Sequence, residues 1–148
     1  MSDKEEYFTH TGSENRERAI LAALVLDNSA TGLEEAERSL NELAELVWAA
    51  GGEAVGRGVQ RRPSPDPTYL VGKGKILELR AACEAQTATM IVFDNELTGS
   101  QIRNIEKLTD VKVVDRTLVI LDIFASRARS REGKLQIDMH GKAEGHYV

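Results

Sequence analysis

Short apolar runs alternate with amphipathic segments along most of this chain, and this alternation limits the folds that it can adopt. The first run, residues 19–26 (AILAALVL), is apolar throughout, which is typical of a strand buried on both faces. Three further short runs follow at 53–61, 90–93 and 111–114, and we interpret them as strands too. Because the run at 53–61 contains two glycines, we expect it to be bulged or to lie at a sheet edge.

Helical patterns lie between and after these runs. After the first strand, apolar residues recur at spacings of three and four, as on one face of a helix, up to Gly51-Gly52. This stripe consists of Leu33, Ala36, Leu40, Leu43 and Val47. Thr31 and Glu34 stand where the N-cap and N3 residues of a capping box would be, so we expect Thr31 to cap this helix.

Three later segments have the same helical character. One helix is expected after residue 75, with Ile76 and Leu79 on its apolar face. The next opens at a second capping box, formed by Thr98 and Gln101. The last spans residues 117–130 and begins apolar on nearly every side.

Strands that alternate with helices pair in parallel and are joined by right-handed crossovers. The sequence therefore predicts an α/β fold, an open sheet of four parallel strands with helices on both faces. We expect this domain to span residues 19–130, after a disordered acidic arm over 1–18 and before a frayed tail over 131–148. Prolines at 63, 65 and 67 indicate an extended loop over 62–68.

Length and composition exclude several classes of protein. A chain of 148 residues has room for one domain plus tails and can fold without a disulfide or a metal. Its single cysteine excludes an internal disulfide, and no apolar run approaches the length of about 18 residues typical of a membrane span. The start of the chain is polar and acidic, unlike a secretory signal peptide, so we expect a cytoplasmic protein.

The net charge of −5 is unevenly distributed. Residues 1–56 hold 4 Lys and Arg against 12 Asp and Glu, whereas residues 57–148 hold 15 against 12. An acidic chain is a poor indiscriminate binder of nucleic acid. The basic excess in the second part nevertheless allows a local surface that faces phosphate.

Polar residues follow the strands, and in open α/β sheets ligands bind at the carboxyl ends of the strands. Arg61 and Arg62 follow the second strand, Asp94 the third and Asp115 the fourth. Carboxylates gathered at one edge can hold Mg²⁺, so Asp94 and Asp115 are candidate metal ligands. We favour the alternative that these acids cap the next helix or turn.

The segment Gly72-Lys73-Gly74-Lys75 lies directly before a predicted helix. Glycines let backbone N–H groups approach an anion, and the positive helix end and two lysines add attraction. The phosphate of a nucleotide or of RNA would fit here, and the alternative is a turn with solvated lysines. The pattern is not a P-loop, because neither GxxxxGK followed by Ser or Thr nor GxGxxG occurs in the chain.

A basic cluster ends the last predicted helix. It consists of Arg127, Arg129, Arg131 and Lys134. RNA phosphates would suit these side chains, and so would the negative C-terminal end of the helix itself, and both interpretations stay open. Cys83 lies on an apolar helix face and is expected to be a buried, inert thiol.

Three segments are distinctive as a set: VQRRPSPDPTYLVGKGKILEL (59–79), TMIVFDNELTGSQIRNIEK (89–107) and VKVVDRTLVILDIFASRARSREGKLQ (111–136). Together they resemble the N-terminal domain of the HflX family of ribosome-associated GTPases, over about residues 19–136. The resemblance implies an α/β domain that leads into a long antiparallel helical hairpin and then a GTPase domain. It also implies that the whole protein binds the large ribosomal subunit and uses GTP to dissociate stalled ribosomes.

The chain departs from that family pattern in two places. Leu118 stands where family members usually have glycine, and after Gln136 the sequence IDMHGKAEGHYV replaces the expected long helix. The resemblance therefore implies that most of the hairpin and the whole GTPase domain lie outside this chain. No GTP hydrolysis is expected from this chain alone, and GTP would bind only to the missing GTPase domain.

We expect a domain that binds the large ribosomal subunit or its RNA without a required cofactor. The expected contacts are Arg61, Arg62, Lys73, Lys75, Arg127, Arg129, Arg131 and Lys134. Two alternatives stay open. The Gly72–Lys75 segment could hold ATP with Mg²⁺, since adenine-nucleotide binding is also ascribed to the family's N-terminal region, or the domain could regulate a GTPase domain.

Overall fold

A computed structural model describes residue 8 and residues 15–26 and 30–137 of the chain. The elements follow the predicted order: β1 (Glu17–Val25), α1 (Ala30–Ala50), β2 (Gly52–Arg61), α2 (Lys73–Gln86), β3 (Met90–Phe93), α3 (Gly99–Thr109), β4 (Lys112–Asp115) and α4 (Arg116–Ile137). Within these residues, no helix is long and apolar enough to cross a membrane.

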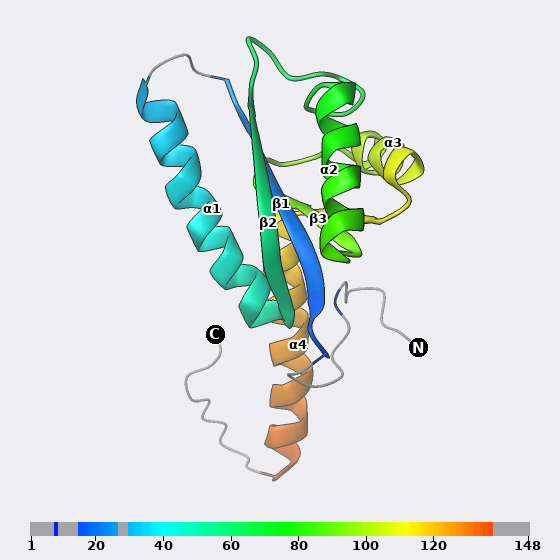
Figure 1. Cartoon of the computed structure of the whole chain (residues 1–148). Helices are drawn as coiled ribbons and strands as arrows, with labels where there is room; N and C mark the ends of the chain where they lie inside the picture. The colour runs from blue at the N-terminus through cyan, green and yellow to red at the C-terminus, as the bar shows by residue number, and fades with distance from the viewer. Residues whose placement is uncertain (1–7, 9–14, 27–29, 138–148) are drawn as a thin grey trace.

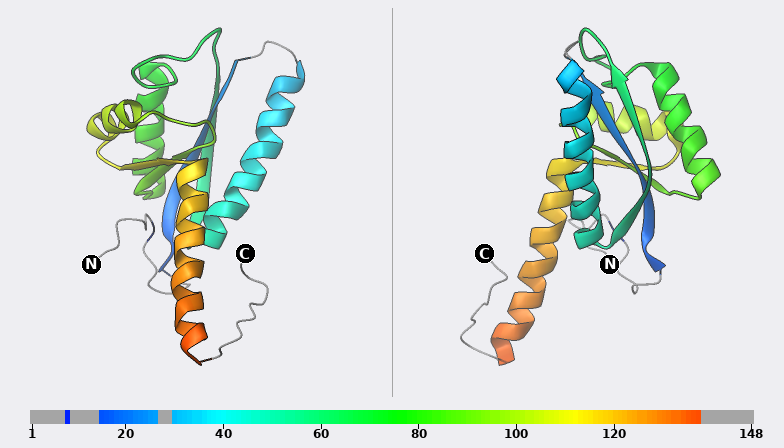
Figure 2. Two further views of the ribbon diagram at one scale, coloured as in Figure 1. Left: turned by 180° about the vertical axis from the view of Figure 1, so that it is seen from behind. Right: turned by 60° about the vertical axis from the view of Figure 1, so that its left-hand side comes forward.

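The four strands form one parallel sheet in the order β2-β1-β3-β4. Helices α2 and α3 cover one face of the sheet, and α1 and α4 cover the other (Figure 1 and Figure 2). Strands β1 and β3 are therefore central, whereas β2 and β4 lie at the edges. The predicted open α/β sheet with helices on both faces is confirmed.

The central strand β1 is buried on both faces, which explains its unbroken apolar run. Ile20 belongs to the core beneath α2 and α3, together with Ile76 and Phe93. Leu21 belongs to the core on the other face, together with Leu43 of α1. Because successive side chains of a strand point to opposite faces, one strand supplies both cores.

Strand β2 is an edge strand with a bulge, as its glycines predict. Ala19 of β1 lies opposite Ala54, but the next residue, Ile20, lies opposite Gly56, so Val55 is an extra residue in β2. A Cβ atom on Gly56 would stand 2.9 Å from Cδ1 of Ile20. A larger residue at this position would therefore require the end of the Ile20 side chain to move.

Helix α1 differs from its prediction at the first turn. It begins at Ala30, so Thr31 lies inside the helix and is not its N-cap. Leu33 was predicted to begin the buried stripe, but its side chain is 43% exposed. The buried face of the helix instead continues from Ala36 to Gly32, which lies four residues earlier and is buried. Residues 27–29, which were expected to end the first strand, lie outside the described residues. The predicted stop at Gly51 is confirmed by its φ of 110°.

The second predicted capping box is confirmed. The Thr98 hydroxyl accepts a hydrogen bond from the backbone N–H of Gln101, and the Gln101 side chain accepts one from the backbone N–H of Thr98. Helix α4, in contrast, runs past its predicted end at residue 130 to Ile137. The added residues are mostly strong helix formers, and a single glycine does not stop the helix. The remainder of the expected tail, 138–148, lies outside the described residues.

Part of the predicted N-terminal arm takes part in the fold. Glu17 and Arg18 already belong to β1, and the Phe8 side chain is only 4% exposed. A Cβ atom on Gly52 would stand 2.8 Å from Cε2 of Phe8 and 3.0 Å from Cγ1 of Val47. Phe8 therefore packs against the junction of α1 and β2, and the rest of residues 1–14 lies outside the described part of the chain.

Candidate functional site

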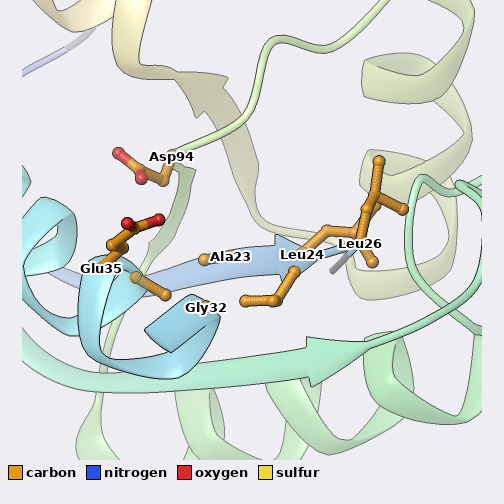
Figure 3. A pocket seen from close by; sticks show the side chains of 8 residues that line it. Ala23, Leu24, Leu26, Gly32, Glu35 and Asp94 are labelled. Carbon is orange, nitrogen blue, oxygen red and sulfur yellow. The ribbon is translucent and has the colours of Figure 1, made fainter. Parts of the chain in front are cut away.

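The strand order contains a reversal between β1 and β3. The connection from β1 leads through α1 to β2 on one side, whereas the connection from β3 leads through α3 to β4 on the other. Ligands of open α/β sheets bind at the carboxyl ends of the strands at such a reversal. An open hollow of about 300 Å³ lies there between β1 and the first turns of α1 (Figure 3). Its lining residues are Ala23, Leu24, Val25, Leu26, Gly32, Glu35, Ala36 and Asp94.

Asp94, one of the two candidate metal ligands, already has donors on both carboxylate oxygens. Oδ1 accepts hydrogen bonds from Nη2 of Arg116 at 2.7 Å and from Nε of Arg116 at 2.9 Å. Oδ2 accepts one from the hydroxyl of Ser39 at 2.6 Å. The carboxylate therefore ties the end of β3 to α1 and to the start of α4.

Asp115, the other candidate ligand, is 3% exposed and caps the next helix. Its Oδ1 accepts from the backbone N–H of Leu118 at 3.0 Å, and its Oδ2 accepts from the backbone N–H of Leu97 at 2.9 Å. This geometry matches the capping interpretation, and a metal ion at Asp94 or Asp115 would compete with these donors for the carboxylate oxygens. No group of three or more His, Cys, Asp or Glu side chains that could hold a metal occurs among the described residues.

Asn95 has a structural role at this end of the sheet that the sequence did not reveal. Its side-chain oxygen accepts from the backbone N–H of Leu24 at 2.8 Å, and its side-chain nitrogen donates to the Leu24 carbonyl at 3.1 Å. The amide thus continues the pairing of β1 beyond the end of β3. The only signal in the sequence was a polar residue directly after Asp94.

The Gly72–Lys75 segment was predicted to precede a helix, but α2 begins at Lys73, so only Gly72 lies before it and the other three residues form the first turn. Gly72 is the N-cap, and because glycine has no side chain, no side-chain acceptor caps the first turn. The Gly72 N–H itself donates to the side-chain oxygen of Gln60 at 2.8 Å. Gly74 faces open space, since no atom lies within 4 Å of the place where its Cβ would be.

Arg62 brings a positive charge to this same helix end. Its Nε donates to the carbonyl of Ser64 at 3.1 Å, and its Nη1 lies 3.2 Å from where a Cβ of Gly72 would be. Lys73 is exposed, whereas Lys75 pairs with Glu78 at 3.0 Å. The positive helix end, Arg62 and Lys73 therefore lie together, and Lys75 is partly neutralised.

The loop between β2 and α2 is held in one conformation. The backbone groups of Asp66 and Leu70 bond to each other in both directions, at 2.9 and 2.8 Å. Leu70 has a φ of 69°, and the Val71 N–H donates to the Tyr69 carbonyl at 2.7 Å, which together indicate a γ-turn of the rare, strained kind. The buried side chains of Leu70 and Val71 hold this strained turn against the core.

Helix α3 also supports this loop. The Gln101 side chain donates to the carbonyls of Asp66 at 3.2 Å and Pro67 at 3.4 Å. The Asn104 side chain donates to the carbonyl of Thr68 at 3.2 Å. The prolines predicted an extended loop, but nothing in the sequence alone paired it with these two side chains.

The structure divides the predicted RNA contacts into two groups. Arg61, Arg62 and Lys73 lie at the carboxyl end of the sheet. Arg127, Arg129, Arg131 and Lys134 lie in the second half of α4, which starts at the carboxyl end of β4 and runs toward and past the opposite end of the sheet (Figure 2). Arg127 is exposed, and the side chains of the other three lie outside the described part. The two groups do not form a single surface.

Cys83 lies on the inner face of α2 and is 2% exposed. Burial, and to a smaller extent the nearby charge of Glu84, raises the pKa of the Cys83 thiol to about 11. The prediction that Cys83 is buried is confirmed, and its low reactivity stays a prediction.

Comparison with known proteins identifies the family to which this chain belongs. A family model described as GTP-binding GTPase N-terminal matches residues 37–125. This chain belongs to that family. The resemblance of its three distinctive segments to the N-terminal domain of HflX-type GTPases is thereby confirmed.

Curated relatives agree with this assignment. The GTPase HflX of Caldanaerobacter subterraneus is 45% identical over 125 residues, which cover 84% of this chain and 28% of the relative. The GTPase HflX of Lacrimispora saccharolytica is 50% identical over 127 residues, covering 85% and 29%, and that of Escherichia coli is 46% identical over 100 residues, covering 68% and 24%. The chain thus spans less than a third of the length of these GTPases.

Solved structures support the fold. The crystal structure of SsGBP with GDP has a TM-score of 0.52 and 22% identity, covering 83% of this chain and 33% of that one. A variant of SsGBP has a TM-score of 0.53 at the same identity. At this identity the likeness shows a shared fold and nothing more.

Proposed function

We propose that this HflX-type N-terminal domain binds RNA of the large ribosomal subunit through phosphate contacts at the carboxyl end of its sheet. The observation that carries the proposal is the start of α2, where Arg62 lies against an uncapped helix end. A guanidinium and a helix N-terminus are both positive, so holding them together is unfavourable unless an anion lies between or beside them. A phosphate group supplies that anion.

The surroundings of this helix end support a phosphate ligand. Lys73 is exposed beside it, and Gly74 leaves the backbone open to approach. The adjoining loop is held by its own backbone and by α3, so little conformational entropy is lost when it binds.

The charge on α1 supports a directed rather than an indiscriminate contact. Its exposed surface carries Glu34, Glu35, Glu42 and Glu45. These carboxylates repel phosphate, so the domain would approach RNA with α1 turned away. This orientation is consistent with a chain of net charge −5 that binds RNA at one local surface.

Co-sedimentation with purified large ribosomal subunits at two salt concentrations tests this proposal. We expect the chain to pellet with the subunits at low salt and less at high salt, because phosphate contacts release counterions. Lys73→Glu should weaken pelleting and lower the slope of log K against log salt by about 1. Lys107→Glu, an equal charge change at an exposed position at the far end of α3, is the matched control.

Two results would contradict the proposal. One is the absence of pelleting at low salt. The other is an equal loss with Lys73→Glu and Lys107→Glu, which would indicate a general charge effect instead of a site at α2.

A nucleotide is the second ligand that the same helix end would suit. The phosphates of ATP would lie at Gly72–Lys75, and Mg²⁺ would need Asp94 or Asp115 to release its present donors. Calorimetric titration with ATP and Mg²⁺ tests this alternative, and the absence of heat at millimolar nucleotide rejects it. We place it second because no group of three or more side chains that could hold the metal ion of ATP and Mg²⁺ occurs among the described residues.

In the relatives, the chemistry of GTP would belong to the part that this chain does not span. The relatives are GTPases, but this chain carries no P-loop sequence. We therefore assign this domain a binding role in the cytoplasm, at the ribosome, and no GTP hydrolysis of its own.

A further inference from the structure

Helix α2 carries an exposed leucine on its outer side, away from the sheet. Ile76, Leu79 and Cys83 are buried against the sheet, whereas the side chain of Leu77 is 42% exposed. In Figure 1, α2 lies along the sheet, so the side opposite the buried residues faces outward. An open hollow of about 270 Å³ lies on this outer side. The residues that line it are Leu77, Arg80, Ala81 and Glu84.

Two opposite charges stand on either side of this leucine. Lys73 lies one turn before Leu77, Glu84 lies two turns after it, and both are exposed. Lys73 and Glu84 stand eleven positions apart, which is about three helical turns, so both lie on the same side of the helix as Leu77. The outer side of α2 therefore has a positive end, an apolar middle and a negative end.

This charge order is complementary to a reversed copy of itself. A two-fold axis that passes midway between Lys73 and Glu84 places two copies of α2 antiparallel, with the same surface used by both. Lys73 of each copy then lies beside Glu84 of the other. Leu77 of each copy faces the hollow beside Ala81 of the other. A parallel pair would instead bring like charges together, which is unfavourable.

The other charged side chains on the flanks of α2 are engaged within each copy. Glu78 pairs with Lys75 at 3.0 Å. Nη1 of Arg80 donates to the carbonyl of Leu108 at 3.4 Å, and Nε of Arg80 lies 3.9 Å from Glu84. The pairing of Glu78 and Lys75 reduces repulsion between the two copies of Glu78 near the axis, and the long distance from Arg80 leaves Glu84 open to a second cation.

We propose that the outer side of α2 binds a second copy of this chain as an antiparallel helix pair. An interface made by one helix from each copy is small, so the dimer is weak and reversible. The dimer covers Lys73, to which the proposed function assigns a phosphate contact, so the dimeric chain binds RNA less well. That consequence rests on the proposed function, whereas the dimer itself does not.

Sedimentation equilibrium of the chain alone, at low salt and without RNA, tests the dimer. We expect the average mass to rise with concentration toward that of two chains, with a dissociation constant below about 1 mM. Lys73→Glu and Glu84→Lys should each raise this constant about tenfold or more, because each substitution reverses two ion pairs in the dimer. Lys107→Glu on α3 and Glu42→Lys on α1 are the matched controls, since they make the same charge changes at exposed positions elsewhere.

Mixing the two charge variants tests the antiparallel arrangement. When Lys73→Glu chain pairs with Glu84→Lys chain, both ends of the helix pair again hold opposite charges. An equimolar mixture should therefore regain the association that each variant lacks alone. Leu77→Ala should also weaken the dimer while leaving the urea midpoint of unfolding nearly unchanged, because this side chain is exposed in the single chain.

Three results would overturn the proposal. A chain that stays monomeric up to about 1 mM leaves the outer side of α2 to a different protein. A dimer that the two charge reversals do not weaken uses another surface. A mixture that associates no better than either variant alone shows that Lys73 and Glu84 do not meet between copies. Ribosomal subunits are absent from all these measurements, so the result is independent of the co-sedimentation test of the proposed function.

Discussion

Asp94 and Arg116 meet across the carboxyl ends of β3 and β4, where two nitrogens of one guanidinium share one carboxylate oxygen at 2.7 and 2.9 Å. Arg116 also donates to the backbone carbonyl and the hydroxyl of Ser39, both at 2.9 Å. The side chains are only 14% and 26% exposed, for Asp94 and Arg116 respectively. This ion pair thus joins three elements at the carboxyl end of the sheet, which is where proteins of this fold bind ligands.

Removing Asp94 should therefore destabilise the domain. Asp94→Ala leaves a mostly buried guanidinium without its carboxylate, and we expect the free energy of unfolding to fall by about 2 kcal/mol. Urea denaturation measures the change as a lower midpoint with an unchanged slope. Glu96→Ala, an exposed carboxylate two residues later, should change the midpoint little. Equal effects of the two substitutions would show that the ion pair contributes nothing particular.

Asp115 should matter through its two backbone partners. Asp115→Ala removes the N-cap of α4 and the acceptor of the Leu97 N–H, at a cost of about 2 kcal/mol in unfolding free energy. Asp115→Asn keeps one acceptor oxygen and should cost less. Thermal denaturation of both variants checks the order, and an asparagine variant as unstable as the alanine variant would mean that one acceptor oxygen without the charge does not stabilise this site.

Phe8 and Gly52 are predicted to be coupled. Gly52→Ala places a methyl group against the Phe8 ring and Val47, so we expect a loss of about 1–3 kcal/mol from overpacking. Phe8→Leu makes room on one side and should restore part of that loss in the double variant. A double-mutant cycle of unfolding free energies measures this coupling. Strictly additive losses would show that the ring does not press on this position.

The thiol of Cys83 should make stability depend on alkaline pH. An unfolded cysteine ionises near its ordinary pKa of 9.0, whereas the folded thiol keeps its proton up to about 11. Between these values the unfolded state binds fewer protons, so the free energy of unfolding falls as pH rises. Cys83→Ala lacks this contribution, and all other titrating groups are common to both chains. The difference in stability between wild type and Cys83→Ala should shrink from pH 9 to 11, and parallel curves would contradict the assignment.

The fold was predictable because its signals are local. The unbroken run of β1 indicated burial on both faces, and the glycines of the second run indicated a bulged edge strand. Thr98 and Gln101 capped α3 as their spacing predicts. The prediction for Thr31 was wrong because a threonine and a glutamate three residues apart also occur one residue inside a helix.

The candidate site was predictable only in pieces. Gly72–Lys75 and Arg62 were separate expectations, and the strained turn at Leu70 brings them together. The ion pair of Asp94 with Arg116 joins residues 22 positions apart, and no periodic pattern reports such a contact. The basic residues of α4 looked like part of the same surface, because a sequence does not say at which end of a sheet a helix finishes.

The bulge at Val55 has a consequence for how the domain behaves in a crowded solution. Strand β2 is ten residues long and has one free edge, the kind of template on which another chain can add a strand. An incoming strand would have to reproduce the extra residue and then pass Arg57, which is fixed by Glu37 at 2.8 Å. Both features disfavour the addition of a strand from another molecule at this free edge.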